Sequence, residues 1–291
     1  MTARTSLFGL MLALFGTLVL TPDALLMRLS GMDGFQMTGW RGLCMGSVMV
    51  LAWSIMSRDR QADLTRLKSY PGLLIVFAQV FNSLFFCLGI AIAPAAVVLL
   101  GVAAVPVFSA LLNRFVTGES TQSATWLAIF AVLFGIAIAV FGGEASGLTL
   151  DWRAIAGAMF GLGTAFVLAM NFVTLRAKPD LPILLAIGLG AWIAGALGWS
   201  VSGAANMSQG HIWPMLVTGL FVLPVSFFAL SLAARHTLAA NVSLLMLLET
   251  ILGPIWVWIG VGEEPTNAMF VGGAIVIGSL AVYLVWLRRS I

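Results

Sequence analysis

The chain has 291 residues, of which 61% are hydrophobic and 9% charged, with a mean hydropathy of +1.07 and a net charge of +3. A soluble domain carries about 25% charged residues, so this composition excludes a soluble globule. It indicates a membrane protein, and the small net charge by itself says little about partners.

Ten apolar segments follow one another along the chain, separated by short loops. A helix of about 20 apolar residues crosses the hydrocarbon core of a bilayer. In order, the segments span 7–29, 35–56, 71–92, 95–116, 122–143, 153–175, 182–203, 212–234, 238–261 and 267–287. The sequence therefore predicts an all-α integral membrane protein with ten transmembrane helices.

Basic residues gather in every second loop of this arrangement. With a cytoplasmic N-terminus, 11 of the 14 Lys and Arg residues lie on the cytoplasmic side, the exceptions being Arg28, Arg41 and Arg153. Cytoplasmic loops of membrane proteins are rich in Lys and Arg. We therefore expect a multi-pass protein of the inner (plasma) membrane with both termini in the cytoplasm.

The two halves of the sequence resemble each other. Six identical residue pairs in segments 7–29 and 154–178 lie 148 positions apart, and Asp23 aligns with Asn171. Five helices per half, an odd number, place the halves in opposite orientations, as in many secondary transporters. The predicted inverted repeats comprise residues 1–147 and 148–291.

Asp23 and Arg41 are ionisable residues in the first two apolar segments. A charge deep in the membrane costs about 2.5–3.5 kcal/mol on insertion scales, so it usually faces a cavity or a partner. Both are candidate coupling or gating residues, and Pro22 beside Asp23 frees a backbone carbonyl. The alternatives are pairing of Asp23 with Arg28 or Arg41, and an Arg41 side chain that extends to the membrane surface.

The third predicted helix carries a polar stripe that ends in an aromatic residue. The stripe consists of Gln79, Asn82, Ser83 and Phe86, whose spacing places them on one face of a helix. Such a stripe lines a cavity or joins helices by hydrogen bonds. Gln79, Asn82 and Phe86 are candidate substrate-binding residues, as is Ser226 in the eighth helix.

Two further candidates for substrate binding are polar residues within apolar helices. Asn171 occupies the position in the sixth helix that aligns with Asp23, and Glu249 lies midway along the ninth. A carboxyl group there can bind substrate or exchange a coupling proton; the alternative is a structural hydrogen bond between helices. Pro106 and Pro254 lie inside predicted helices, where proline produces kinks, so both are candidates for gating movements.

Neither the cysteines nor the histidines form a pattern typical of a catalytic or metal site. Cys44 and Cys87 have no metal-ligand spacing, and His211 and His236 lie in loops on opposite sides of the predicted membrane. A nucleotide-binding GxxxxGK[ST] loop is absent from the sequence. We expect no enzyme activity, cofactor, metal or nucleic acid.

Several short motifs occur in both halves of the chain. In the second half they are Leu247-Leu248-Glu249, Gly253-Pro254, Trp256-Val257-Trp258 and Gly262-Glu263. Their counterparts in the first half are Ala95-Ala96, Pro106-Val107-Phe108 and Gly118-Glu119. These motifs resemble those of the drug/metabolite transporter superfamily, in its ten-helix branch with two EamA-type domains, and Trp40-Arg41-Gly42 resembles the family's arginine in the second helix. The resemblance covers the whole chain and implies transport of a small metabolite, commonly outward, through a cavity between the halves.

Few fixed charges lie near the predicted midplane, which favours a neutral, zwitterionic or aromatic solute. We expect a secondary transporter that works by alternating access, with a small-molecule substrate, the lipid bilayer and a candidate coupling proton as partners. It would act as a monomer or homodimer. The alternatives are a structural or scaffolding membrane protein, and a passive channel, which ordinarily needs a continuous polar lining.

Overall fold

The computed structural model describes residues 3–117, 123–141, 151–237 and 239–289, and all regular secondary structure within them is helical. Glu119, part of one family-like motif, lies outside these ranges. The first half contains α1 (Ala3–Leu20), α2 (Asp23–Ser30), α3 (Gly34–Met56), α4 (Arg60–Leu67), α5 (Tyr70–Ile92), α6 (Ala95–Val102), α7 (Val105–Thr117) and α8 (Ser123–Phe141). The second half contains α9 (Trp152–Ala177), α10 (Ile183–Ser202), α11 (Ile212–Val217), the π-helical turn η1 (Thr218–Val222), α12 (Leu223–His236), α13 (Ala239–Val261) and α14 (Asn267–Arg289).

Three of the predicted helices are interrupted, and each interruption lies at or directly before a proline. The break between α1 and α2 falls at Thr21 and Pro22, and that between α6 and α7 lies just before Pro106. The π-turn η1 ends two residues before Pro224. Proline has no N–H to donate to the carbonyl four residues earlier, so the regular hydrogen-bond ladder fails there. In contrast, α13 continues through Pro254 without a break.

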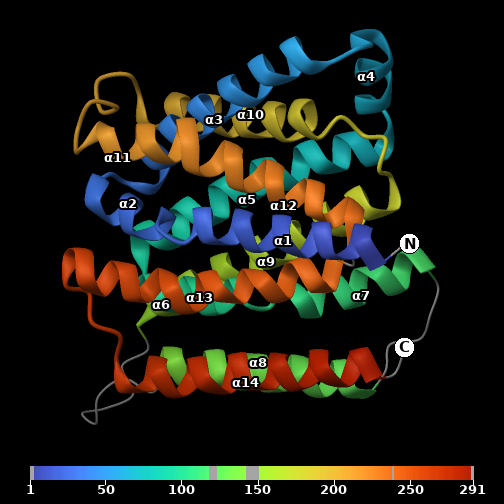
Figure 1. Cartoon of the computed structure of the whole chain (residues 1–291). Coiled ribbons are helices and arrows are strands. Elements are labelled where there is room, and N and C mark those ends of the chain that lie inside the picture. The colour runs from blue at the N-terminus through green and yellow to red at the C-terminus, as the bar shows by residue number, and fades with distance from the viewer. Residues whose placement is uncertain (1–2, 118–122, 142–150, 238, 290–291) are drawn as a thin grey trace.

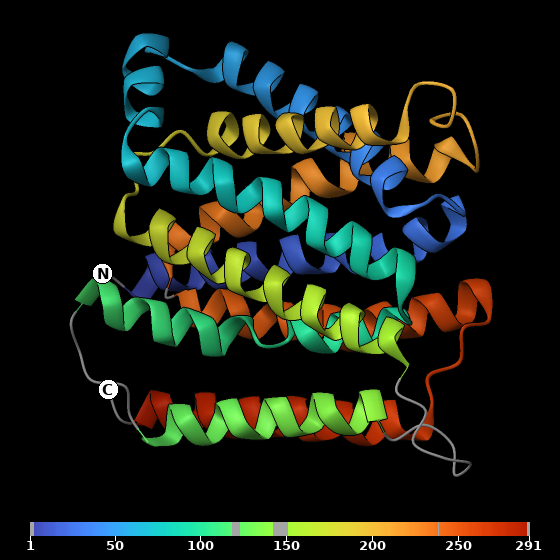
Figure 2. The same cartoon turned by 180° about the vertical axis from the view of Figure 1, so that it is seen from behind.

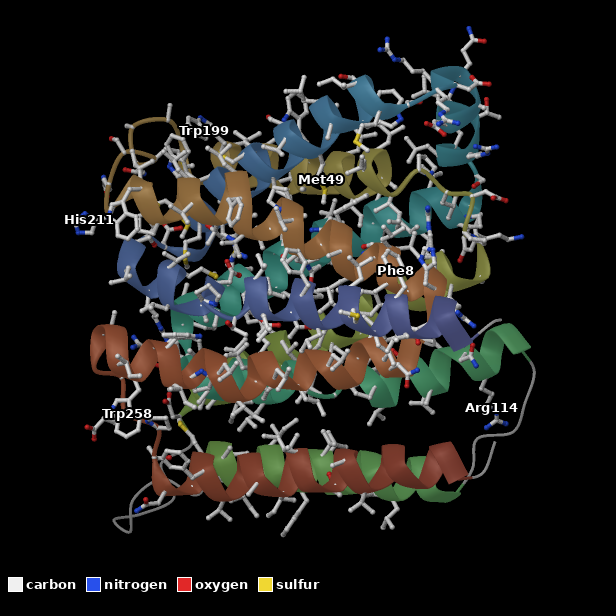
Figure 3. All side chains as sticks on the ribbon, in the orientation of Figure 1. Phe8, Met49, Arg114, Trp199, His211 and Trp258 are labelled. Atoms are coloured by element: carbon white, nitrogen blue, oxygen red, sulfur yellow. The ribbon has the colours of Figure 1, made fainter. Side chains whose placement is uncertain are left out.

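The helices lie side by side in layers (Figures 1 and 2). The pair formed by α3 and α10 lies on one side, and the pair formed by α8 and α14 on the other. Between them, α1 packs against α12 and α5 against α9, with α6, α7 and α13 completing the core. The start of α1 and the end of α14 lie at the same end of the molecule, where Arg114 is also found, while His211 marks the opposite end (Figure 3).

Glycines allow the closest helix contacts. A Cβ atom at Gly42 would lie 2.5 Å from the Ala191 carbonyl oxygen and 2.7 Å from Gly195 Cα, where α3 crosses α10. A Cβ atom at Gly161 on α9 would lie 2.3 Å from the Val98 carbonyl oxygen on α6. Small residues at such crossings let helix backbones approach each other within a membrane.

Seven segments of the described residues are long and apolar enough to cross a membrane: Leu7–Ser30, Tyr70–Ile92, Ala95–Arg114, Trp152–Ala177, Ile183–Ser202, Ile212–His236 and Asn241–Val261. Large apolar side chains also remain exposed on the outside of the helices, including Ile55, Phe134 and Ile259. The protein is therefore an integral multi-pass membrane protein. Because α3, α8 and α14 are not among the seven segments, the ten-helix count and the inverted repeats stay predictions.

Candidate functional site

A narrow cavity lies among the central helices of the molecule. It is bounded by helices of both halves of the chain: α1, α2, α3, α5 and α6 of the first half and α9, α12 and α13 of the second. Its polar lining consists of Asp23, Arg41, Gln79, Asn82, Ser83, Thr164 and Glu249. Its apolar walls include Leu20, Met45, Phe86, Leu168, Phe227 and Met246. An apolar pocket with a few convergent polar groups is typical of a small-molecule site.

Asp23 and Arg41 form a buried ion pair at this cavity. The Nη2 atom of Arg41 lies 2.5 Å from Oδ2 of Asp23, and the two residues are 6% and 1% exposed. The other terminal nitrogen, Nη1, contacts Met27 Sδ and lies 3.5 Å from Cys87 Sγ. The guanidinium carbon is 5.6 Å from the centre of the Phe86 ring. Arg41 is thus held by α2 and α5 and does not extend to the membrane surface.

The break between α1 and α2 explains why Asp23 can occupy this position. The break makes Asp23 the first residue of α2, where a carboxylate interacts favourably with the helix dipole. The Thr21 hydroxyl donates to the Leu18 carbonyl at 2.9 Å and accepts from Trp256 Nε1 at 3.3 Å. Thr21, at the break, is therefore hydrogen-bonded both to α1 and to α13.

The polar stripe on α5 faces the cavity along its length. The side-chain nitrogen of Gln79 donates to the Ser83 hydroxyl at 3.3 Å, while its Oε1 atom has no partner among the described residues. Asn82 and Phe86 line the cavity on the same face. A spacing of three to four residues brings these side chains together on a helix.

Glu249 approaches the cavity from α13 and is 4% exposed. Within the described part of the chain, its carboxyl group makes no hydrogen bond, although it interacts electrostatically with Asp23 and Arg41. Met246, one helical turn earlier, lines the cavity beside it. An ionisable group in this setting, buried and without a fixed partner, is available for a ligand or a proton.

Four residues proposed from the sequence lie away from the cavity lining. Asn171 is buried on α9, and its Oδ1 atom has no partner in the described residues. Ser226 is fully buried and donates to the Leu223 carbonyl at 3.3 Å. Pro254 lines a second, apolar cavity between α13 and α14, and Pro106 is the second residue of α7. Roles for these four residues in binding or gating stay predictions.

Thr164 and Met246 are among the lining residues that were not expected from the sequence. Thr164 lies two helical turns before Asn171 on α9 and donates to the Phe160 carbonyl at 2.8 Å. Met246 precedes Glu249 by three residues, so helical spacing from Glu249 identifies it. A similar spacing joins Thr164 to Asn171, but the cavity ends before it reaches Asn171.

At each end of the molecule, an arginine side chain joins neighbouring segments of the chain. At one end, Arg28 Nη2 donates to the Ala93 carbonyl at 2.6 Å, and Arg28 Nε lies 2.9 Å from Glu263 Oε2. The same Glu263 side chain accepts from the Ala95 backbone N–H at 2.7 Å, at the start of α6. At the other end, Arg176 Nη1 donates to the Thr237 carbonyl at 2.8 Å. Arg28 and Arg176 occupy aligned positions in the two halves of the sequence.

The fold defines a multi-pass membrane protein with a central cavity lined by both halves of the chain. Residues 5–141 match the family described as the EamA-like transporter family. Proteins of this family are generally transporters and not enzymes.

Two related proteins agree with this match, and a solved structure shares the fold. The chain is 24% identical to "Uncharacterized transporter YdfC" of Bacillus subtilis (strain 168), across 82% of this chain and 78% of the relative. It is 28% identical to "Uncharacterized transporter sll1164" of a Synechocystis species, across 59% of this chain and 52% of that protein. A crystal structure with 19% sequence identity superimposes with a TM-score of 0.67 and covers 97% of both chains, so the fold is shared. The family match and the two relatives support a membrane transporter.

Proposed function

We propose that the protein is a secondary transporter that moves a small neutral, zwitterionic or aromatic metabolite outward across the inner membrane by alternating access. The central cavity carries this proposal. It has apolar walls, few polar groups and contributions from both halves of the chain. A site between two halves can open to either side of the membrane when one half rocks against the other.

The pairing of helices supports two repeats, residues 1–147 and 148–291, around this site. Repeats of five helices would equate α1 with α9 and α5 with α12. The contact of α1 with α12 then corresponds to the contact of α9 with α5, and both occur. The starts of α1 and α9 lie at opposite ends of the molecule, the arrangement expected of inverted repeats (Figure 2).

The charges at the cavity suit a small solute and not a polyanion. The positive charge of Arg41 is already matched by Asp23, and Glu249 adds only negative charge. A phosphate-rich substrate would need several free basic groups, and the described lining offers none.

Glu249 is the residue that we propose for exchange of a coupling proton. The titratable or charged groups that surround the cavity with it are Asp23 on α2, Arg41 on α3 and Cys87 on α5. Because Asp23 and Arg41 already pair with each other, Glu249 is the carboxyl group free to alternate between a proton and a substrate. Uniport without a proton is the alternative.

The test is transport by the purified protein in lipid vesicles, with amino acids, vitamins, nucleosides and aromatic amines as candidate substrates and with and without a pH gradient. Saturable uptake that Glu249→Gln reduces supports the carrier. Glu264→Gln is the matched control, because Glu264 is exposed outside the cavity. Uptake that never saturates would indicate a channel, and absence of transport for every compound would indicate a structural protein.

A further inference from the structure

The central cavity holds several hydrogen-bond acceptors that have no partner among the described residues. Three oxygen-bearing groups at the cavity lack a partner among the described residues: the carboxyl group of Glu249, Oε1 of Gln79 and Oδ1 of Asp23. Gln79 and Asp23 are each 1% exposed, so their free oxygens have little access to bulk water. Buried polar atoms are nearly always satisfied in folded proteins, so three unpaired acceptors around one cavity indicate that a ligand supplies the donors.

The arginine at the cavity is already occupied. Arg41 Nη2 is engaged by Asp23, Nη1 contacts two sulfur atoms, and only Nε lacks a partner. A carboxylate is bound most strongly by the two parallel N–H groups of a guanidinium. Arg41 cannot offer such a pair of donors while its pairing with Asp23 persists, so the site disfavours the carboxylate of an amino acid.

The charges at the cavity also favour a solute with a positive charge. Asp23 and Arg41 cancel, so Glu249, once deprotonated, is the one uncompensated charge among the described lining residues. A cation that enters this cavity would neutralise that charge and satisfy the free oxygens at once. A polar neutral group would satisfy oxygens without matching the charge.

We propose that the substrates of this cavity are organic monocations, with a protonated primary amine on a compact apolar or aromatic body. The ammonium group donates to Glu249 and to the free oxygens of Gln79 and Asp23, because it has three N–H donors to give. The body lies against the apolar walls that Phe86, Phe227 and Met246 provide. This inference rests on the proposed function and replaces its neutral and zwitterionic solutes by cationic amines without a carboxylate.

Four probes with one phenylalkyl body and different charges test the proposal directly. They are 2-phenylethylamine (cation), phenylalanine (zwitterion), 3-phenylpropionate (anion) and 2-phenylethanol (neutral). Binding to the purified full-length protein is measured by thermal stabilisation and by displacement of radiolabelled 2-phenylethylamine. We expect the amine to bind at least about tenfold more tightly than the other three. Phenylalanine adds a carboxylate for which Arg41 has no free pair of donors, and the other two probes have no ammonium group to form charge-assisted hydrogen bonds with Glu249.

Glu249→Gln should weaken binding of the amine by about tenfold or more and leave binding of 2-phenylethanol unchanged, while Glu264→Gln should change neither. The comparison of four probes on the unmodified protein stands even if Glu249→Gln does not fold. Equal or tighter binding of phenylalanine or 3-phenylpropionate overturns the inference, as does binding of none of the four. Saturable vesicle transport of another solute would then leave the carrier intact, whereas its absence would overturn the carrier as well.

Discussion

Asp23 and Arg41 form an ion pair 2.5 Å long across the junction of α2 and α3, at the edge of the central cavity. The pair joins two consecutive helices of the first half, and Met27, Phe86 and Cys87 surround the guanidinium. A buried charge without a partner is far more costly than a buried pair. The geometry of the cavity therefore depends on both members.

Removal of one member of this pair should destabilise the protein strongly. We expect Asp23→Asn and Arg41→Gln each to lower the free energy of unfolding by about 3–5 kcal/mol, because each leaves an uncompensated buried charge or donor. The double variant should lose clearly less free energy of unfolding than the sum of the losses in the two single variants. Denaturant unfolding in detergent measures all three, and strict additivity would contradict a direct interaction.

The crossing of α3 and α10 should be sensitive to one added methyl group. In Gly42→Ala, the new Cβ would lie 2.5 Å from a backbone oxygen of α10, so the helices must separate. We expect a loss of about 1–3 kcal/mol in unfolding free energy and a lower melting temperature. Gly278→Ala is the control, because a Cβ there meets no atom within 4 Å; equal effects would argue against close packing at Gly42.

Phe227 should contribute apolar contact to the bound solute. Its ring lines the cavity, whereas that of Phe221 on the same transmembrane segment is 61% exposed. We expect Phe227→Ala to weaken substrate binding by about tenfold through lost apolar burial, and Phe221→Ala to leave it unchanged. Titration of both purified variants with the same labelled solute distinguishes them. Similar affinities in the two variants would indicate that the solute binds outside the central cavity.

Glu263 ties three segments at one end of the molecule through Arg28 and the Ala95 N–H. We expect Glu263→Gln to raise the fraction of molecules in which this end is open, by about two- to fivefold, as for a weak partly exposed ion pair. Cys87 at the cavity is a native reporter once Cys44 is changed to Ser. The rate of its modification by a small water-soluble maleimide should rise in Glu263→Gln but not in Glu264→Gln.

The arrangement of the helices places the start of α1 and the end of α14 at one end of the molecule (Figure 1). Arg114, Arg176 and Arg235 belong to helices that end on this side, which matches the preference of basic residues for the cytoplasm. We expect epitope tags at both termini to be protected from protease in intact cells. Digestion of either tag from outside would contradict two cytoplasmic termini.

The sequence by itself determined where most helices begin and end. The predicted segments 35–56 and 238–261 correspond to α3 (Gly34–Met56) and α13 (Ala239–Val261) within one residue at each end. The cause is local, because the length of an apolar run and the polar residues that flank it decide which part of the chain enters the membrane. The polar stripe on α5 could also be predicted from the sequence, since helical spacing alone places Gln79, Asn82 and Phe86 on one face.

Only the tertiary structure decided which neighbour each side chain meets. The sequence allowed Asp23 to pair with Arg28 or Arg41. The position of α2 beside α5 brings Asp23 within reach of Arg41 from α3, while Arg28 meets Glu263, which is 235 positions away. Asn171 and Thr164 share a face of α9, yet only Thr164 reaches the cavity. Periodicity fixes the face of one helix, but the depth and crossing angle at which helices pack determine where that face meets the cavity.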